Sequence, residues 1–161
     1  MQSEMMWHNS TETNGNILIE PSVVELVRGY CQHQSNMPES GGILLGYRRG
    51  THLHVVSATT PQRDDQRKRF HFSRCDQYHQ NVAISQWNMS GNTMDYIGEW
   101  HTHPEPKPTP SSLDMSEWKK ICCARKSSMV FLIVGWTGVF WLGVGRGQHI
   151  AQVSEVSIED Y

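Results

Sequence analysis

The spacing of apolar residues changes several times along the chain, and each change marks a boundary between expected elements. The segment ILIEPSVVELVRGYCQH, which begins at Ile17, predicts a short strand and then a helix. Pro21 suits the first turn of a helix, and apolar residues follow it at helical spacing. The apolar face of this helix is expected to comprise Val23, Val24, Leu26, Val27 and Tyr30.

In the middle of the chain, apolar residues occur at every second position, which is the pattern of a strand. Ile43, Leu45 and Tyr47 alternate, and Gly50 suits a tight turn, so the segments ILLGYRR and THLHVVSATT are expected to form a hairpin. The charged stretch PQRDDQRKR follows as a loop. Helical spacing returns in SRCDQYHQNVAISQWNM, the residues SGNT end that helix, and MDYIGEWHTHP is expected as a strand.

The last third of the chain predicts one more helix and three strands. SLDMSEWKKICCARK is an amphipathic pattern that directs Leu113, Trp118, Ile121 and Cys122 toward the core. SSMVFLIVGW, GVFWLGVGR and HIAQVSEV follow as strands separated by glycine-containing turns. Helices between groups of strands, with hairpins at both ends, predict an α/β sandwich built around a curved mixed sheet flanked by helices.

Length and composition favour one domain. A chain of 161 residues with 37% apolar residues and six tryptophans can bury one substantial core. The first residues are polar and rich in Asn and Thr, so we expect a flexible arm over residues 1–15 and a domain over residues 16–161.

The charge and the cysteine content limit the classes of binding partner and the cellular compartments that we expect for this protein. The net charge of −2, from 14 basic and 16 acidic residues, argues against nucleic acid or an anionic membrane as the main partner. The four cysteines include no CxxC pair, the N-terminus lacks a signal-peptide pattern, and no apolar run reaches membrane-spanning length. We therefore expect a cytoplasmic protein, in which one of the adjacent Cys122 and Cys123 lies in the core and the other is free.

The segment GEWHTHPEPKPTPSSLD carries the candidate chemistry. On a strand, His101 and His103 point to the same face and can offer two nitrogens to one metal ion. Asp114 follows eleven residues later, across a loop stiffened by four prolines. Two nitrogens and one carboxylate leave the fourth position of a tetrahedral zinc open, which is typical of a catalytic site. Glu39, just before two glycines, is the candidate general base.

Structural alternatives exist for each of these patterns. SSLD is also an N-cap pattern, in which Ser111 caps a helix and Asp114 lies in its first turn. A second HxH pair, His52 and His54, has no SxxD close behind it, which makes it a weak metal candidate.

Two further features have ordinary explanations. His71, Cys75 and His79 are spaced four apart but straddle an expected boundary between strand and helix. The charged loop of residues 61–69 is either a solvated connection or a patch that grips an acidic face of a protein substrate.

Taken together, Glu39 followed by GGILLG, and HTH followed by seven residues to Ser111 and two more to Asp114, resemble the JAMM metallopeptidases, also called MPN-plus or JAB domains. The resemblance implies that His101, His103 and Asp114 bind one zinc ion per chain. It further implies that Glu39 is the base that activates water, and that Ser111 helps to hold the oxyanion.

The resemblance also implies a class of substrate. JAMM enzymes hydrolyse amide or isopeptide bonds after the C-terminal tail of ubiquitin or a ubiquitin-like protein. The compact length looks most like the stand-alone peptidases of bacterial antiphage operons that signal with cyclic oligonucleotides (CBASS). There, beside activating-enzyme and conjugating-enzyme homologues, the peptidase releases a nucleotidyltransferase from its conjugates.

Several alternatives remain open from the sequence. The same fold occurs in peptidases that process a sulfur-carrier precursor, in binding modules without catalysis, and in a branch associated with DNA repair. An extended tail is expected to add as a strand at a sheet edge, bordered by residues 92–97 or by the loop 61–69. The apolar final strands, with Phe140, Trp141 and Leu142, offer an edge for a partner.

Overall fold

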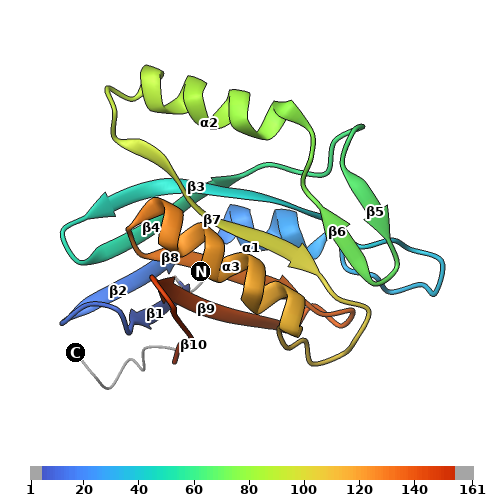
Figure 1. Cartoon of the computed structure of the whole chain (residues 1–161). Helices are drawn as coiled ribbons and strands as arrows, with labels where there is room; N and C mark the ends of the chain where they lie inside the picture. The colour runs from blue at the N-terminus through green and yellow to red at the C-terminus, as the bar shows by residue number, and fades with distance from the viewer. Residues whose placement is uncertain (1–4, 155–161) are drawn as a thin grey trace.

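The computed structural model describes residues 5–154 and arranges them as two sheets and three helices (Figure 1). Eight strands form one sheet in the order β1-β2-β4-β3-β7-β8-β9-β10, and β5 pairs only with β6. The strands are β1 Met5–Asn9, β2 Gly15–Ile19, β3 Gly41–Arg49, β4 His52–Ala58, β5 Gln66–Lys68, β6 His71–Ser73, β7 Met94–Thr102, β8 Met129–Val134, β9 Phe140–Arg146 and β10 His149–Gln152. The helices are α1 Pro21–Arg28, α2 Gln77–Met89 and α3 Ser112–Arg125.

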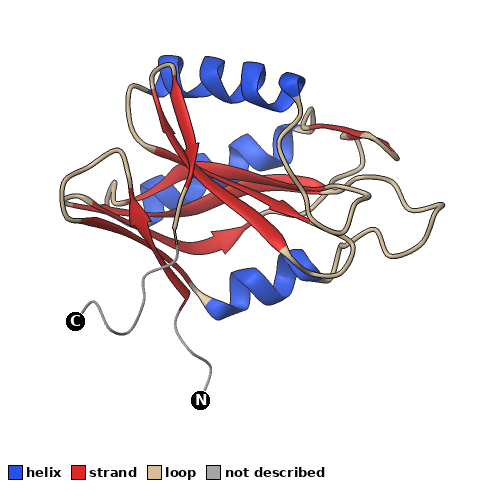
Figure 2. Ribbon diagram, turned by 90° about the horizontal axis from the view of Figure 1, so that it is seen from below, coloured by secondary structure: helices blue, strands red, loops and turns tan. Residues whose placement is uncertain are grey.

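The large sheet separates two apolar layers. It is mixed, because β2 pairs with β4 and β7 pairs with β8 in parallel, whereas its other pairs are antiparallel. Strand β8 is buried on both faces, and its successive side chains enter two different clusters. Val130, Leu132 and Val134 join the cluster that includes α1, and Met129, Phe131 and Ile133 join the cluster that includes α3. Figure 2 shows the sheet between helices on either side. The predicted single α/β domain with a curved mixed sheet is confirmed.

The helices follow their sequence patterns in part. Pro21 begins α1, and Val23, Val24 and Val27 are buried as predicted, but Leu26 is partly exposed. In α3, Trp118 and Cys122 are buried, whereas Leu113 is half exposed, so the prediction that Leu113 faces the core is wrong. Within residues 5–154, no helix has the length and apolar character needed to cross a bilayer.

The N-terminus is more ordered than its composition suggested. Residues Met5–Asn9 form β1, which pairs antiparallel with β2, so the prediction of a flexible arm over residues 1–15 is wrong from residue 5 onward. Trp7 is buried, and its ring contacts Phe140 edge-on with 5.7 Å between centroids. Met5 also packs against this core cluster, so apolar side chains anchor β1 at the edge of the sheet. Residues 1–4 of the expected arm and the C-terminal boundary at residue 161 lie outside the described residues.

The segment expected as a charged loop contains a hairpin. β5 pairs with β6, and the helix expected to begin near Ser73 begins only at Gln77, where the Asp76 carboxylate accepts a hydrogen bond from the Tyr78 backbone N–H at 2.9 Å. β5 consists of three exposed polar residues, Gln66–Lys68, and so short a polar strand has no apolar periodicity by which the sequence could reveal it.

Candidate metal centre

The pairing of β3 with β7 places Glu39 opposite the second histidine. Gly41 is the partner of His101 in this antiparallel ladder, and one step further the Thr102 N–H donates to the Ser40 carbonyl at 2.9 Å. The next step of the same register sets Glu39 opposite His103. The pairing of β3 with β7 thus brings Glu39 and His103 together although they lie far apart in the sequence.

Gly41 allows the surrounding backbone to close around this point. A Cβ atom there would lie 2.5 Å from the Phe72 ring of β6 and 2.7 Å from the Trp100 carbonyl oxygen. No side chain fits in that space, so the glycine lets the β5–β6 hairpin pack directly against the start of β3. The two glycines after Glu39 are therefore explained by close approach of neighbouring chain, as predicted from the sequence.

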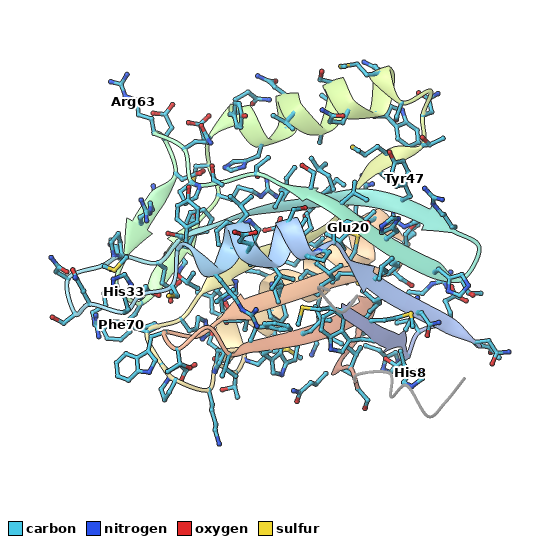
Figure 3. All side chains as sticks on the ribbon, turned by 180° about the vertical axis from the view of Figure 1, so that it is seen from behind. His8, Glu20, His33, Tyr47, Arg63 and Phe70 are labelled. Atoms are coloured by element: carbon cyan, nitrogen blue, oxygen red, sulfur yellow. The ribbon has the colours of Figure 1, made fainter. Side chains whose placement is uncertain are left out.

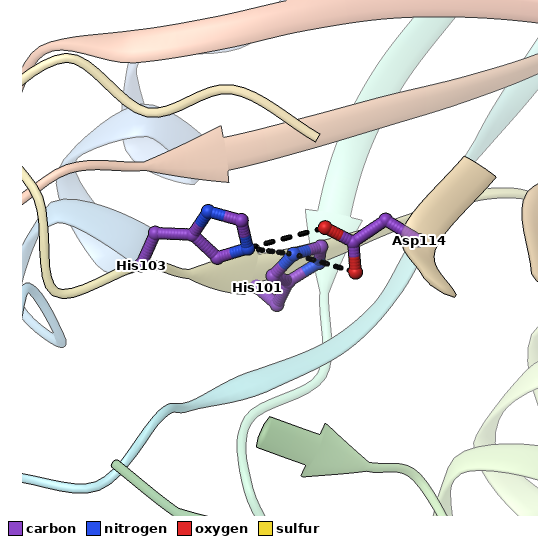
Figure 4. Close-up of side chains that lie close together, drawn as sticks. All are labelled: His101, His103 and Asp114. Carbon is purple, nitrogen blue, oxygen red and sulfur yellow. Dashed lines mark hydrogen bonds and ion pairs between the residues drawn. The ribbon is translucent and has the colours of Figure 1, made fainter. Parts of the chain in front are cut away.

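Three potential metal ligands converge at the end of β7 (Figure 4). The Nε2 atoms of His101 and His103 lie 3.0 Å apart, and Asp114 places Oδ1 3.4 Å from the first and Oδ2 3.2 Å from the second. Two donors that are each about 2.0–2.1 Å from a tetrahedral zinc ion lie roughly 3.3 Å from one another. The spacing of these atoms fits one zinc ion, although zinc binding itself stays a prediction.

Asp114 reaches the histidines from the first turn of α3. The Ser111 hydroxyl accepts a hydrogen bond from the Asp114 backbone N–H at 3.0 Å, and Asp114 Oδ2 accepts one from the Ser111 backbone N–H at 2.8 Å. This capping box confirms the N-cap interpretation of SSLD. The same two hydrogen bonds fix the carboxylate of Asp114, so the structural and the metal-binding interpretations are compatible.

Electrostatics in this cluster favour the ionised carboxylate. Burial would raise the pKa of Asp114, but hydrogen bonds from His101 and His103 outweigh it and hold the pKa well below its usual range. For His103, burial opposes protonation, while hydrogen bonds to Asp114 and Glu105 raise its pKa to about 9.

Glu39 is a buried carboxyl group in the wall of the same cleft. Only 4% of its surface is exposed, and burial raises its pKa to about 8, against the opposing effect of the charge on His103. Its backbone is held by the β5–β6 hairpin: the Glu39 N–H donates to the Lys68 carbonyl at 2.7 Å, and the Arg67 Nε donates to the Glu39 carbonyl at 3.0 Å. The backbone of Glu39 is therefore held in place beside the cluster, and burial gives its carboxyl group a higher pKa than usual.

One residue of the site was missed in the sequence. Glu105 accepts a hydrogen bond on Oε1 from the Nδ1 atom of His103 at 2.9 Å, and the Thr109 backbone N–H donates to the same oxygen at 3.2 Å. Metal-binding histidines usually donate their second ring N–H to such a group, which fixes the tautomer and the ring orientation. The acidic residue two positions after His103 was the available signal.

The five predicted site residues line one cleft of about 670 Å³. Its walls come from the β5–β6 hairpin, from the end of β7 and from the first turns of α3. Among the wall residues, Phe70 and Leu113 are exposed apolar side chains on opposite elements. Figure 3 shows Phe70 projecting away from the body of the protein. The cleft thus combines buried titratable groups with apolar walls, as expected of a site that binds and converts a ligand.

The other histidine patterns have structural roles. His52 Nδ1 accepts a hydrogen bond from the Asn16 N–H at 3.0 Å, and His54 pairs with Glu20 at 2.6 Å. His79 is fully buried between Asp65 and Thr59, at 2.7 and 2.6 Å. Within residues 5–154, neither pattern brings three potential ligand atoms together.

The cysteines divide as expected. Cys122 is buried in the α3 cluster, where burial raises its pKa to about 11, and Cys123 is exposed. A buried thiol with a raised pKa is a poor nucleophile. The geometry therefore does not favour a cysteine-dependent reaction at this position.

Comparison with known proteins agrees with the geometry. Residues 24–144 match the family described as prokaryotic homologs of the JAB domain. Two relatives bear the name CD-NTase/cGAS isopeptidase. The one from Pseudomonas aeruginosa is 40% identical over 113 residues, which are 70% of this chain and 72% of the relative. The one from Vibrio cholerae is 37% identical over 143 residues, which are 89% of this chain and 90% of the relative.

A solved structure shares the fold. The solution structure of a protein from Desulfitobacterium hafniense covers 84% of this chain, and this chain covers 88% of it, with a TM-score of 0.60. The two sequences are 23% identical, so this likeness concerns the fold alone.

Proposed function

This chain belongs to the family of prokaryotic homologues of the JAB domain, and on that premise we propose that it is a zinc-dependent isopeptidase. The bond it cuts is the amide or isopeptide bond after the C-terminal tail of a conjugated protein. The observation that supports this most directly is the convergence of His101, His103 and Asp114 beside the buried carboxyl group of Glu39.

The names of the relatives suggest the substrate. They are named CD-NTase/cGAS isopeptidases, and we propose that the conjugated protein is a nucleotidyltransferase of bacterial antiphage defence. Activating-enzyme and conjugating-enzyme homologues would form the conjugate in the cytoplasm, and this protein would reverse it.

His101, His103 and Asp114 would hold the zinc ion through Nε2 atoms and a carboxylate. When bound, zinc lowers the pKa of water to about 7 and polarises a carbonyl group. Glu39 would accept the proton that the attacking water loses as the new C–O bond forms. It would then deliver that proton to the nitrogen of the leaving amine as the amide C–N bond breaks. The raised pKa of Glu39, to about 8, suits a group that must both take up and release this proton near neutral pH.

Ser111 would stabilise the developing oxyanion. Its oxygen accepts a hydrogen bond from the Asp114 N–H, which leaves the hydroxyl proton available to a ligand in the cleft. The capping box holds the serine in this position.

The cleft favours an extended polypeptide as the ligand. Residues 70–74 of the β5–β6 hairpin and its following turn line the cleft, whereas residues 92–97 do not. We therefore propose that the tail enters between this hairpin and α3. Whether the charged residues 61–69 contact the substrate stays a prediction.

The test is intact-mass analysis of an isopeptide-linked conjugate after incubation with zinc-loaded protein. We expect the wild type to release the tail at its terminal residue. Glu39→Gln should retain fold and zinc but lose activity by about 10²–10⁴-fold, which is the usual contribution of general base catalysis. If Glu39→Gln cleaves at the wild-type rate, the assigned base is wrong.

Two further measurements separate the alternatives. Cleavage of a sulfur-carrier precursor, but not of the conjugate, would indicate a processing peptidase. Failure to bind zinc at micromolar concentration would favour a binding module without catalysis.

A further inference from the structure

A groove leads away from the active-site cleft beneath α2. Arg74 lines both the cleft and an adjoining hollow of about 540 Å³ between α2 and α3, whose floor includes Ile43 and Tyr96. A second hollow, of about 590 Å³, continues from there and shares Trp87 and Asp95 with the first. We call these two adjoining hollows the α2 groove.

The α2 groove carries a surplus of positive charge. Four arginines line it, Arg48, Arg49, Arg74 and Arg125. Asp95 is the acidic residue in its wall, and it is already paired with Arg48 at 2.9 Å and with Arg125 at 2.9 Å. The whole chain has a net charge of −2, so this positive groove is a local feature rather than a property of the surface in general.

Arg74 and Arg49 mark the two ends of the groove. Arg74 pairs with Glu99 at 2.6 Å, and that carboxylate also accepts a hydrogen bond from the Tyr96 hydroxyl at 2.6 Å. Arg49 is exposed and lies over the ring of Tyr47 at 4.9 Å; within residues 5–154 it makes no ion pair. Tyr47 lies on β3, near the C-terminal end of α2 (Figure 3). The far end of the groove therefore offers a cation on an aromatic surface.

Apolar side chains line the groove between these ends. On α2, Ile84 is 51% exposed and Trp87 is 39% exposed, and both border the hollow. Large exposed apolar side chains beside arginines are typical of binding surfaces, where Trp, Tyr and Arg supply most of the binding energy.

We propose that the α2 groove binds an acidic segment of the conjugated protein that carries an apolar or aromatic side chain. This rests on the proposed isopeptidase function. Arg74 lines both the cleft and the groove, so the two are continuous. A protein whose tail lies in the cleft can therefore reach the groove with another segment, and we assign the groove to that protein. Carboxylates of that segment complement the unpaired charge of Arg49, and the apolar side chain packs between Ile84 and Trp87. The cleft thus recognises the scissile tail, and the groove recognises the protein to which the tail belongs.

The first test is independent of catalysis. A fluorescent peptide with four acidic residues around one leucine is titrated onto the full chain, and binding is followed by anisotropy at low salt. We expect Arg49→Glu and Trp87→Ala to weaken binding roughly tenfold, in the range of hot-spot substitutions. Leu26→Ala, a partly exposed apolar residue on the opposite face, and Arg146→Glu, an exposed arginine on β9, should bind as the wild type does.

Equal binding by all variants, or no binding by the wild type, overturns the proposal. The choice of partner is tested by competition between a single-stranded oligonucleotide and the unlabelled peptide. If the oligonucleotide displaces the fluorescent peptide at the lower concentration, an acidic protein segment is the wrong partner.

The second test separates docking from chemistry. For the full conjugate, Arg49→Glu should raise KM about tenfold with unchanged kcat, whereas a short tail peptide joined by the same bond should be cleaved as by the wild type. Equal effects on both substrates overturn a docking role for the groove. If the wild type cleaves neither substrate, the proposed function fails, and the peptide titration still decides whether the groove binds an acidic segment.

Discussion

We expect the hydrogen bond between Glu105 and His103 to strengthen zinc binding by an amount that can be measured. The carboxylate accepts a hydrogen bond from His103 Nδ1 at 2.9 Å, and it is itself held by the Thr109 N–H at 3.2 Å. Glu105→Ala removes the acceptor, and Glu105→Gln keeps a neutral acceptor in place. Both substitutions leave His101, His103 and Asp114 unchanged.

The expected loss follows from the geometry. Partners of metal-binding histidines typically contribute about 10–100-fold to metal affinity. The side chain of Glu105 is 43% exposed, so water can partly replace it, and we expect the lower end of this range. Glu105→Ala should therefore weaken zinc binding about tenfold, or about 1.4 kcal/mol, and Glu105→Gln should fall between it and the wild type.

Competition with a chromophoric zinc chelator at neutral pH measures this difference without any substrate. Glu117→Ala is the matched control, because Glu117 lines the same cleft and makes no hydrogen bond or ion pair with the histidines within residues 5–154. Wild-type affinity in Glu105→Ala, or an equal loss in Glu117→Ala, would refute a positioning role for Glu105.

Two further predictions concern stability. Gly41→Ala should lower the free energy of unfolding by about 1–3 kcal/mol in a urea titration, because the new Cβ would lie 2.5 Å from the Phe72 ring and 2.7 Å from a backbone carbonyl; unchanged stability would mean that the hairpin is not packed there. Asp65→Ala should lower it by about 3 kcal/mol at pH 7, since it leaves the Nε2 atom of the fully buried His79 without its hydrogen-bond partner. Burial would raise the pKa of Asp65, but hydrogen bonds from the Asp76 backbone N–H and from His79 outweigh it and lower this pKa below 3.8. The ionised carboxylate therefore stabilises the fold above that pH. This contribution to stability is lost as the pH falls through the folded-state pKa. The stability difference between wild type and Asp65→Ala should therefore shrink below about pH 4, and a constant difference would contradict the assignment.

The local patterns in the sequence were sufficient for most elements and for the candidate ligand cluster. Period-two alternation identified β3 as part of a hairpin with β4, helical spacing identified α1 and α3, and the HxH pair with Asp114 identified residues that the structure brings together. These features depend on residues close in the chain, whose relative directions are fixed by strand or helix geometry. The same reason explains why SSLD could be identified as a cap from sequence alone.

Other features depended on contacts between distant segments. Trp7 of β1 contacts Phe140, which lies far away in the sequence. The β5–β6 hairpin is held by hydrogen bonds to the backbone of Glu39, which its own residue pattern does not reveal. Leu113 has the spacing of a core residue, yet it faces the cleft because α3 meets the sheet with its later turns.

The sequence by itself determined which residue types were available for chemistry and which of them shared a face of one strand or one turn of a helix. Only the tertiary structure decided that Glu39 stands opposite His103, that Glu105 holds the ring of that histidine, and that the α2 groove continues the cleft. The physical reason is that side-chain direction within a segment follows from backbone geometry. The register and packing between segments instead depend on the burial of the whole core, to which residues from every part of the chain contribute.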